Sequence, residues 1–460
     1  MEKENGLTLY SGAEKRITLP PPRGTMKLFN KRILKSFVWV FAVGICLVVM
    51  VSLHEIAIQQ KERIRTLVPS SSWIGNTIQK AYHDNITRVS ENHDVTSDIT
   101  HQSKPSPVTH IGFLKVHKAA STTTQAIFLR FGWRRNLTFV LSPEYNKFGY
   151  PNIISTNESI TKYNTLPPPP GKTFDILCNH VVYGDKEWST VLPSDTVMIG
   201  TIREPFGHFK SVLNYFNPRS ILFIQTSIDP TDPVGTFLKN PRQYEGAKVV
   251  RHSFTNNRLA FEYGIAPEII INRDFAAFEE YLTEVLDKKF KVVLLAEQYD
   301  ESLVLMKRKL NWSLKDIMYA IKNVRSVHKE DRYVLREEHR ALHRNYSIFD
   351  YLLFEFFEDR LNKQIEAEGG DFQEEVDNFK QIRKFVENFC HIVPKYIQSV
   401  RIDESRWTES FDITRSDCEL MHQGEISFVQ MIRKRQYGSA SWKGVKQVLK
   451  QIPKNITRTY

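Results

Sequence analysis

The sequence predicts an α/β domain with a central parallel sheet flanked by helices, preceded by one N-terminal transmembrane helix. Three observations support this prediction. An uncharged apolar segment lies near the N-terminus, short strands rich in β-branched residues begin at residue 111, and helical patterns follow three of these strands. Of the 460 residues, 41% are hydrophobic and 25% are charged, as in a folded globular protein.

The transmembrane helix is predicted at Ser36–Leu53, which contains no charged residue. As a helix this segment spans about 27 Å, enough for the hydrocarbon core of a bilayer. Lysine and arginine precede it without any acidic residue at 21–35, whereas Glu55 and Glu62 follow it. This asymmetry predicts a single-pass type II protein with its N-terminus in the cytosol. The 35 residues before the apolar segment and the lack of a small-x-small cleavage site argue against a cleaved signal peptide.

These features divide the chain into a cytosolic tail (1–35), a signal anchor (36–53), a polar stem (54–108) and a lumenal domain (109–460). A lumenal domain suits the six N-x-S/T sequons, which all follow the anchor: Asn85, Asn136, Asn157, Asn311, Asn345 and Asn455. Cys46 lies within the anchor, which leaves three cysteines. We expect a Cys390–Cys418 disulfide and a free, buried Cys178.

Four apolar stretches are expected to form buried parallel strands: Ile111–Val116, Thr173–Cys178, Thr196–Ile202 and Lys291–Glu297. Helical patterns follow the first, third and fourth of them, at Ser121–Phe131, Pro205–Phe216 and Asp300–Leu310. A further amphipathic helix is predicted at Glu374–Cys390.

The turn between the first strand and its helix predicts an anion site. Lys118 precedes small and hydroxyl residues, and the amides of Ala120, Ser121, Thr122 and Thr123 would point outward at the positive end of the helix dipole. The alternative is a plain N-capping cluster, which would explain one hydroxyl but not four beside lysines and a histidine. No Walker P-loop is present, because Gly112 is not followed by Gly-Lys at the required spacing.

The next two strands also end in polar groups. His180 follows the second strand, Arg203 follows the third, and Ser211 lies eight residues after Arg203. Because ligands bind at the carboxyl edge of a parallel sheet, we expect these side chains to lie close to Lys118 and His117. The pattern predicts two phosphate-sized anion sites with a histidine beside them. A structural histidine, and a helix-capping ion pair for Arg203, are the alternatives.

Two other motifs receive structural interpretations. His339 and His343 in HRALH have metal-ligand spacing, but a third ligand is missing, so a solvated helix face is expected. Arg433–Arg435 is expected to be a solvated basic patch.

Several motifs resemble one known family. FLKVHKAASTT (Phe113–Thr123) resembles the 5′-phosphosulfate loop of carbohydrate sulfotransferases, above all the galactose 3-O-sulfotransferases such as the galactosylceramide type. That family's 3′-phosphate segment resembles TIREPFGHFKSVLNYF at Thr201–Phe216. Three more of its motifs recur here: CNH at Cys178–His180, AEQYDESLVLMKRKLNW at Ala296–Trp312 and DYLLF at Asp350–Phe354. The resemblance runs in order from about residue 110 to 360. Val116 and Ala119 replace threonines usual in the family, and little after Glu366 is similar.

The resemblance implies a P-loop-like sulfotransferase fold and transfer of a sulfuryl group from 3′-phosphoadenylyl sulfate (PAPS) to the 3-hydroxyl of galactose. It assigns the 5′-phosphosulfate to Lys115, Lys118 and the segment Ala120–Thr123, and the 3′-phosphate to Arg203 and Ser211. No metal is required, since the cations are side chains. The net charge of +11 agrees with an anionic co-substrate.

A base must take the proton of the acceptor hydroxyl. His180 is the first choice and His117 the second, because a histidine titrates near neutrality. The expected partners are the Golgi membrane and a galactose-terminated glycolipid or glycoprotein, with no nucleic acid. Whether the chain forms a homodimer is left open by the sequence. A secretory-pathway glycan kinase and a non-catalytic glycan-binding membrane protein are the alternative functions.

Overall fold

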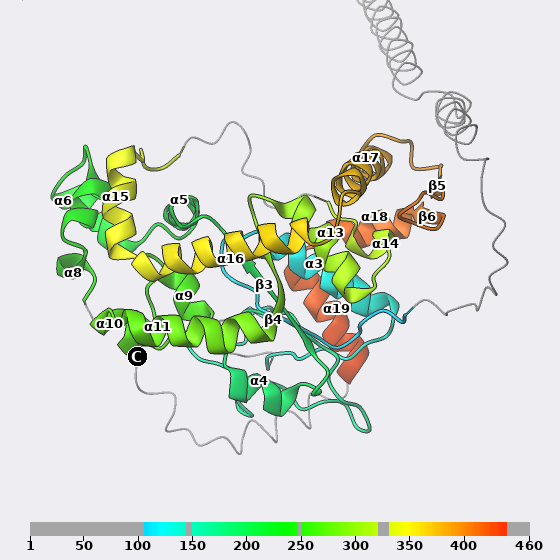
Figure 1. Cartoon of the computed structure of the whole chain (residues 1–460), viewed down its shortest axis with the longest axis horizontal. Coiled ribbons are helices and arrows are strands. Elements are labelled where there is room, and N and C mark those ends of the chain that lie inside the picture. The colour runs from blue at the N-terminus through cyan, green and yellow to red at the C-terminus, as the bar shows by residue number, and fades with distance from the viewer. Residues whose placement is uncertain (1–104, 144–149, 247–249, 321–330, 439–460) are drawn as a thin grey trace, which may run out of the picture. The chain divides into compact units, whose positions relative to one another are not determined.

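The protein is described from a computed structural model over residues 105–143, 150–246, 250–320 and 331–438, all within the unit Ser103–Tyr460. Its centre is a four-stranded parallel sheet in the order β2–β1–β3–β4 (Figure 1). Ile111 pairs with both Ile176 and Val197, and Thr201 pairs with Leu294. The predicted central parallel sheet is therefore confirmed. Its strands are β1 Ile111–Phe113, β2 Ile176–Leu177, β3 Val197–Ile202 and β4 Phe290–Leu295.

The first two strands are shorter than the apolar stretches that predict them. Leu114 and Val116 are fully buried, although β1 ends at Phe113. An apolar stretch indicates burial and not strand pairing, and here the buried chain continues past the last paired residue of the strand into a loop. β3 begins one residue later than expected, and β4 ends two residues earlier than expected.

Helices surround the sheet (Figure 1). The bounds of α5 agree with the prediction, because Pro205 occupies its first turn and the Glu204 carboxylate accepts hydrogen bonds from the amides of Phe206 and Gly207. Helix α16 packs against β4 and α9, while α19 packs against α3. The helices are α3 Ser121–Arg134, α4 Asp185–Val191, α5 Pro205–Phe216, α6 Arg219–Ser227, α7 Pro233–Lys239, α8 Pro241–Tyr244, α9 Arg258–Glu262, α10 Pro267–Asn272, α11 Phe275–Tyr281, α12 Asp287–Lys289, α13 Tyr299–Leu310, α14 Leu314–Ile317, α15 Glu337–Tyr346, α16 Ile348–Glu366, α17 Phe372–His391, α18 Arg415–His422 and α19 Glu425–Tyr437, with a π-helical turn at Leu282–Leu286.

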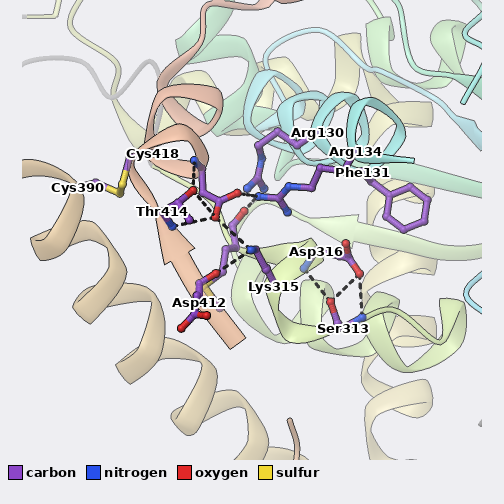
Figure 2. A network of polar contacts seen from close by, with 12 residues as sticks. Arg130, Phe131, Arg134, Ser313, Lys315, Asp316, Cys390, Asp412, Thr414 and Cys418 are labelled. Atoms are coloured by element: carbon purple, nitrogen blue, oxygen red, sulfur yellow. Dashed lines mark hydrogen bonds and ion pairs between the residues drawn. A yellow bond between two sulfur atoms is a disulfide. The ribbon is translucent and has the colours of Figure 1, made fainter. Parts of the chain in front are cut away.

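The segment after α16 is tied to the sheet domain through α3. It contains α17, the antiparallel pair β5 (Ser399–Ile402) and β6 (Phe411–Thr414), α18 and α19. Asp417 at the start of α18 forms ion pairs with Arg134 of α3 and Lys315 of α14, in the network of Figure 2. The predicted Cys390–Cys418 disulfide joins α17 to α18, and Cys178 is free and buried as expected. The C-terminal segment is therefore fixed to the last turn of α3.

The predicted anchor and stem lie outside the described residues. Within 105–438, leaving out the gaps, no helix combines the length and hydropathy needed to span a bilayer. Four sequons fall inside the described ranges, and Asn136, Asn311 and Asn345 are exposed there. Asn157 is only 8% exposed and its Oδ1 accepts a hydrogen bond from Ser155. A glycan at Asn157 does not suit the folded domain, because glycans occupy surface positions.

Two structural interpretations of motifs are wrong. His339 and His343 are buried rather than solvated, because α15 packs against α5, α7 and α16. His343 stacks on Phe209, with ring centroids 4.3 Å apart. Arg433 is also buried, and its Nη1 donates to the carbonyl of Ser142 at 2.7 Å. A charge pattern along one helix does not reveal which neighbouring elements will cover it.

Candidate active site

The loop between β1 and α3 has an unusual backbone. Lys118 and Ala120 adopt left-handed conformations, with φ of 60° and 59°. A left-handed conformation costs roughly 1–2 kcal/mol in a residue that has a Cβ, so surrounding contacts must hold the loop in place. Ala120 is also the N-cap of α3 and provides no side-chain cap. The N-cap residue therefore leaves the first amides of α3 without a side-chain acceptor.

Side chains from other elements hold four carbonyl groups of this loop. These donors come from the ends of β2 and β3 and from α5, so they turn the carbonyl oxygens toward the protein. The four hydrogen bonds are His180 Nδ1 to Lys115 O (2.8 Å), His208 Nε2 to His117 O (2.9 Å), Arg203 Nη1 to Lys118 O (3.3 Å) and Thr201 Oγ1 to Ala119 O (2.6 Å). The predicted meeting of the three strand ends is confirmed by these contacts.

The amides at the start of α3 agree largely with the prediction. Within the described ranges, no residue accepts a hydrogen bond from the amides of Ala120, Ser121 or Thr122. Thr123 differs, because its amide donates to the Ala120 carbonyl at 3.2 Å. Free amides at a helix N-terminus bind phosphate and sulfate groups well. The loop can therefore bind an anion of that size.

Two histidines lie together beside this loop. The rings of His117 and His180 are stacked, with centroids 3.7 Å apart and planes 15° apart. His117 Nδ1 contacts Glu262 Oε1 at 2.5 Å, and the His117 amide donates to Glu262 Oε2 at 2.8 Å. Arg258 contacts the same carboxylate at 2.6 Å. Glu262 therefore orients His117, as a carboxylate orients the base in hydrolytic triads.

Charge distinguishes the two histidines. Burial raises the pKa of Glu262, but Arg258 and His117 outweigh this effect and lower it to about 2. Burial lowers the pKa of His117, and the Glu262 carboxylate partly offsets that shift. The pKa of His180 lies well below its usual value because burial, His117 and Lys115 all oppose a proton there. A positive charge is therefore tolerated better on His117 than on His180.

Lys118 and Arg203 provide the cations of the site. The Lys118 ammonium lies 3.8 Å from the centroid of the Tyr215 ring, and burial together with Arg203 lowers its pKa. The Arg203 side chain is 35% exposed and 4.0 Å from the Glu297 carboxylate. Ser211 is half-buried on α5, and its hydroxyl has no hydrogen-bond partner among the residues that the structure describes. These three side chains remain available to a ligand.

Lys115 has a different position from the one expected of a ligand-binding lysine. Its side chain is fully buried, and its Nζ lies 2.7 Å from Glu425 Oε2 in the first turn of α19. Thr122 Oγ1 donates to the same oxygen at 3.3 Å. In this structure the Glu425 carboxylate oxygen contacts both the Lys115 ammonium and the Thr122 hydroxyl at the start of α3.

Sequence reasoning missed Glu262, Arg258 and Glu425. Glu262 lies 145 residues from His117, and Glu425 lies 310 residues from Lys115. Neither glutamate belongs to a motif with readable spacing, and Glu425 falls in the segment without family resemblance. Only the packing of α9 and α19 brings these carboxylates to the loop.

The described part of the chain contains one group of side chains with spacing suited to a metal ion. The one group of three side chains there with suitable spacing is Asp232, Glu338 and His339. Arg336 Nη1 already lies 3.2 Å from Asp232, and none of the three follows a strand of the sheet. This group of three is therefore not an acidic set at a strand end of the kind that kinases use.

Comparisons with known proteins agree with the motifs. The family model described as Galactose-3-O-sulfotransferase matches residues 58–401. Human galactose-3-O-sulfotransferase 2 is 30% identical over 297 residues, which cover 63% of this chain and 70% of the relative. Human galactosylceramide sulfotransferase is 32% identical over 219 residues (48% and 49%), and mouse galactose-3-O-sulfotransferase 3 is 34% identical over 220 residues (47% and 48%). The chain thus matches about half the length of these last two relatives. No solved structure matches it significantly.

Proposed function

The chain belongs to the galactose-3-O-sulfotransferase family, and on this premise we propose that it transfers a sulfuryl group from PAPS to the 3-hydroxyl of a galactose residue. The acceptor is a galactose-terminated glycolipid or glycoprotein glycan. The observation that carries the proposal is the uncapped N-terminus of α3, next to the His117–Glu262 pair.

The proposed donor site uses two regions of positive potential. Lys118 and the amides of Ser121 and Thr122 bind the 5′-phosphosulfate, and Arg203 with Ser211 binds the 3′-phosphate. Lys118 also stabilises the negative charge that grows on the departing phosphate. Because Lys115 pairs with Glu425, that lysine supports the loop in this proposal instead of contacting the donor.

The proposed base is His117, although the sequence alone favoured His180. Its Nδ1–H donates to Glu262, which leaves the Nε2 lone pair free to accept a proton and stabilises the imidazolium that results. His180 donates Nδ1–H to the Lys115 carbonyl and has no carboxylate partner among the described residues, so protonating it costs more. His180 then supports the His117 ring from its stacked face.

The chemical step is an in-line displacement. The galactose 3-oxygen bonds to sulfur, while the bond between sulfur and the bridging phosphate oxygen breaks and leaves its electron pair on that oxygen. The hydroxyl proton passes to His117 Nε2. The products are a 3-sulfated galactose and adenosine 3′,5′-bisphosphate, and a metal is not needed to balance the charge.

The proposal is tested with the full-length chain in detergent, PAPS carrying a labelled sulfate, and a panel of galactose-terminated acceptors. We expect labelled product, and a loss on the order of 10²–10⁴ in rate for His117→Ala. Transfer of phosphate from ATP would favour a glycan kinase, and acceptor binding without transfer would favour a non-catalytic glycan-binding protein. Either outcome would contradict the proposal.

The cellular context is part of the same proposal. The uncharged Ser36–Leu53 and the basic residues before it support a single-pass type II protein of the Golgi membrane, with the sheet domain in the lumen. Protease protection in sealed microsomes tests this topology. Digestion of the sheet domain without detergent would contradict it.

A further inference from the structure

Three aromatic rings form a corner beside His117, and we call Tyr215, Phe216 and Phe254 the aromatic corner. The Phe254 ring lies edge-on to His117 with centroids 5.2 Å apart, and Phe216 lies 6.3 Å from His117. Phe216 packs against Phe254 at 4.3 Å, and Tyr215 stands at 85° to Phe216 at 4.9 Å. The corner therefore borders the proposed base directly.

Packing of the fold does not account for the exposure of the corner. Helix α5 buries a separate apolar face, made of Phe206, Phe209, Val212 and Leu213, whereas Tyr215 and Phe216 at its end are 68% and 37% exposed. Exposed aromatic rings side by side are costly unless a ligand or partner covers them.

The corner is also held in place. The Arg258 guanidinium lies 4.2 Å from the Phe254 ring, and Arg258 is fixed by its ion pair with Glu262. The same carboxylate orients His117. Phe254 and the proposed base therefore share one support, which fixes their relative position as a substrate site requires.

We propose that the aromatic corner binds the acceptor galactose, with the C–H face of the sugar against Phe216 and its 3-hydroxyl directed at His117. This proposal rests on the sulfotransferase function proposed above. The C–H groups at carbons 3, 4 and 5 of galactose form one apolar face, and aromatic ring faces attract such weakly positive C–H groups. The 3-hydroxyl is equatorial and projects from the edge of the sugar ring, so stacking leaves it free to meet the base.

The position of the corner favours the acceptor over the donor nucleotide. Phe216 and Phe254 contact the ring of His117, the group assigned to the acceptor proton. The Tyr215 ring contacts the Lys118 ammonium, which is assigned to the transferred sulfate. Arg203, assigned to the 3′-phosphate, has no ring contact with the corner among the described residues.

The test compares Phe216→Ala with Phe216→Tyr, which keeps the ring, and with Phe385→Ala, which removes a similarly exposed ring on α17. We expect Phe216→Ala to raise the acceptor KM about tenfold or more with a smaller change in kcat, and Phe216→Tyr to raise the acceptor KM less because it keeps the ring. Phe385→Ala should stay near wild type. Affinity for adenosine 3′,5′-bisphosphate, measured by calorimetry, should be unchanged. Phe216→Leu, which keeps apolar volume without the ring, serves if the alanine variant unfolds.

A second readout is independent of turnover. Saturation-transfer NMR with methyl β-galactoside should show the strongest transfer at protons 3, 4 and 5, and Phe216→Ala should remove it. An unchanged acceptor KM in a folded variant, or weaker binding of the bisphosphate, would overturn the acceptor assignment while leaving the sulfotransferase function in place. Absence of any sulfated product from the wild type would instead contradict the proposed function.

Discussion

Replacing Glu262 by glutamine removes a buried charge while keeping nearly the same volume. Glu262 is 3% exposed and contacts His117 through both its backbone amide and its ring, and Arg258 through its guanidinium. The substitution leaves the fully buried Arg258 without its carboxylate partner. It also deprives His117 of the charge that stabilises its protonated form.

The loss of stability follows from two estimates. The pKa of Glu262 falls from 4.5 to about 2, and about 1.4 kcal/mol for each pKa unit gives a contribution of roughly 3 kcal/mol at neutral pH. Breaking a buried ion pair by removing one partner costs about 3–5 kcal/mol. Because the folded pKa is depressed, this stability is present above about pH 4.5 and is lost as the pH falls toward 2.

The effect on catalysis should be similar in free energy to the effect on folding. We expect kcat to fall on the order of 10²–10⁴-fold, since the imidazolium at His117 is no longer neutralised. The pKa of His117 falls further without Glu262, so the acidic limb of the kcat/KM profile should move to lower pH.

Urea unfolding at pH 7 and steady-state sulfation measure the two effects, with Glu268→Gln on the surface of α10 as the matched control. A Glu262→Gln variant that keeps wild-type kcat, or that loses less than about 1 kcal/mol of stability, would refute the assignment of Glu262 as the partner of the base.

Three further predictions follow from buried and exposed groups. Glu425→Ala should lower the free energy of unfolding by about 3 kcal/mol or more, because it leaves Lys115 buried and charged without its partner. In a double-mutant cycle, adding Lys115→Met should recover much of this loss. Additive losses would contradict the pairing of Lys115 with Glu425. The pKa of His208 and of His343 is lowered to about 3, chiefly by burial, so the unfolded chain takes up protons below pH 6.5 that the folded chain does not. Each of the two histidines should therefore lower the free energy of unfolding, measured with urea, by about 2 kcal/mol between pH 7.5 and pH 5. A urea midpoint that does not change with pH would argue against their burial. Glycopeptide mass spectrometry of the secretory-pathway protein should find glycans at the exposed Asn136 and Asn311 but not at Asn157, and an occupied Asn157 would contradict its position in the structure.

Local sequence patterns predicted which strand ends and helix starts carry the polar residues of the site. The strand ends and helix starts at Lys118, His180 and Arg203 could be read from apolar periodicity, proline position and hydroxyl clusters. The rule that parallel strands present their carboxyl ends at one edge then brought these residues together, as the structure confirms.

What the sequence could not provide depends on contacts between distant elements. The carboxylate of Glu262 comes from α9, and that of Glu425 comes from α19, so no spacing along the chain links them to the loop. The resemblance assigns Lys115 to the 5′-phosphosulfate, but it gives no sign of the ion pair that Lys115 makes with Glu425 of α19. The aromatic corner likewise joins the end of α5 to Phe254, which lies just before α9.

The central claim is that Lys118 and Arg203 serve one doubly phosphorylated nucleotide, and calorimetric titration with adenosine 3′,5′-bisphosphate tests it most directly. We expect one binding site per chain, weakened on the order of tenfold or more in both Lys118→Ala and Arg203→Ala, and unchanged in Lys172→Ala, a lysine outside the site. No binding heat with the wild type, or equal affinity in all variants, would contradict the claim.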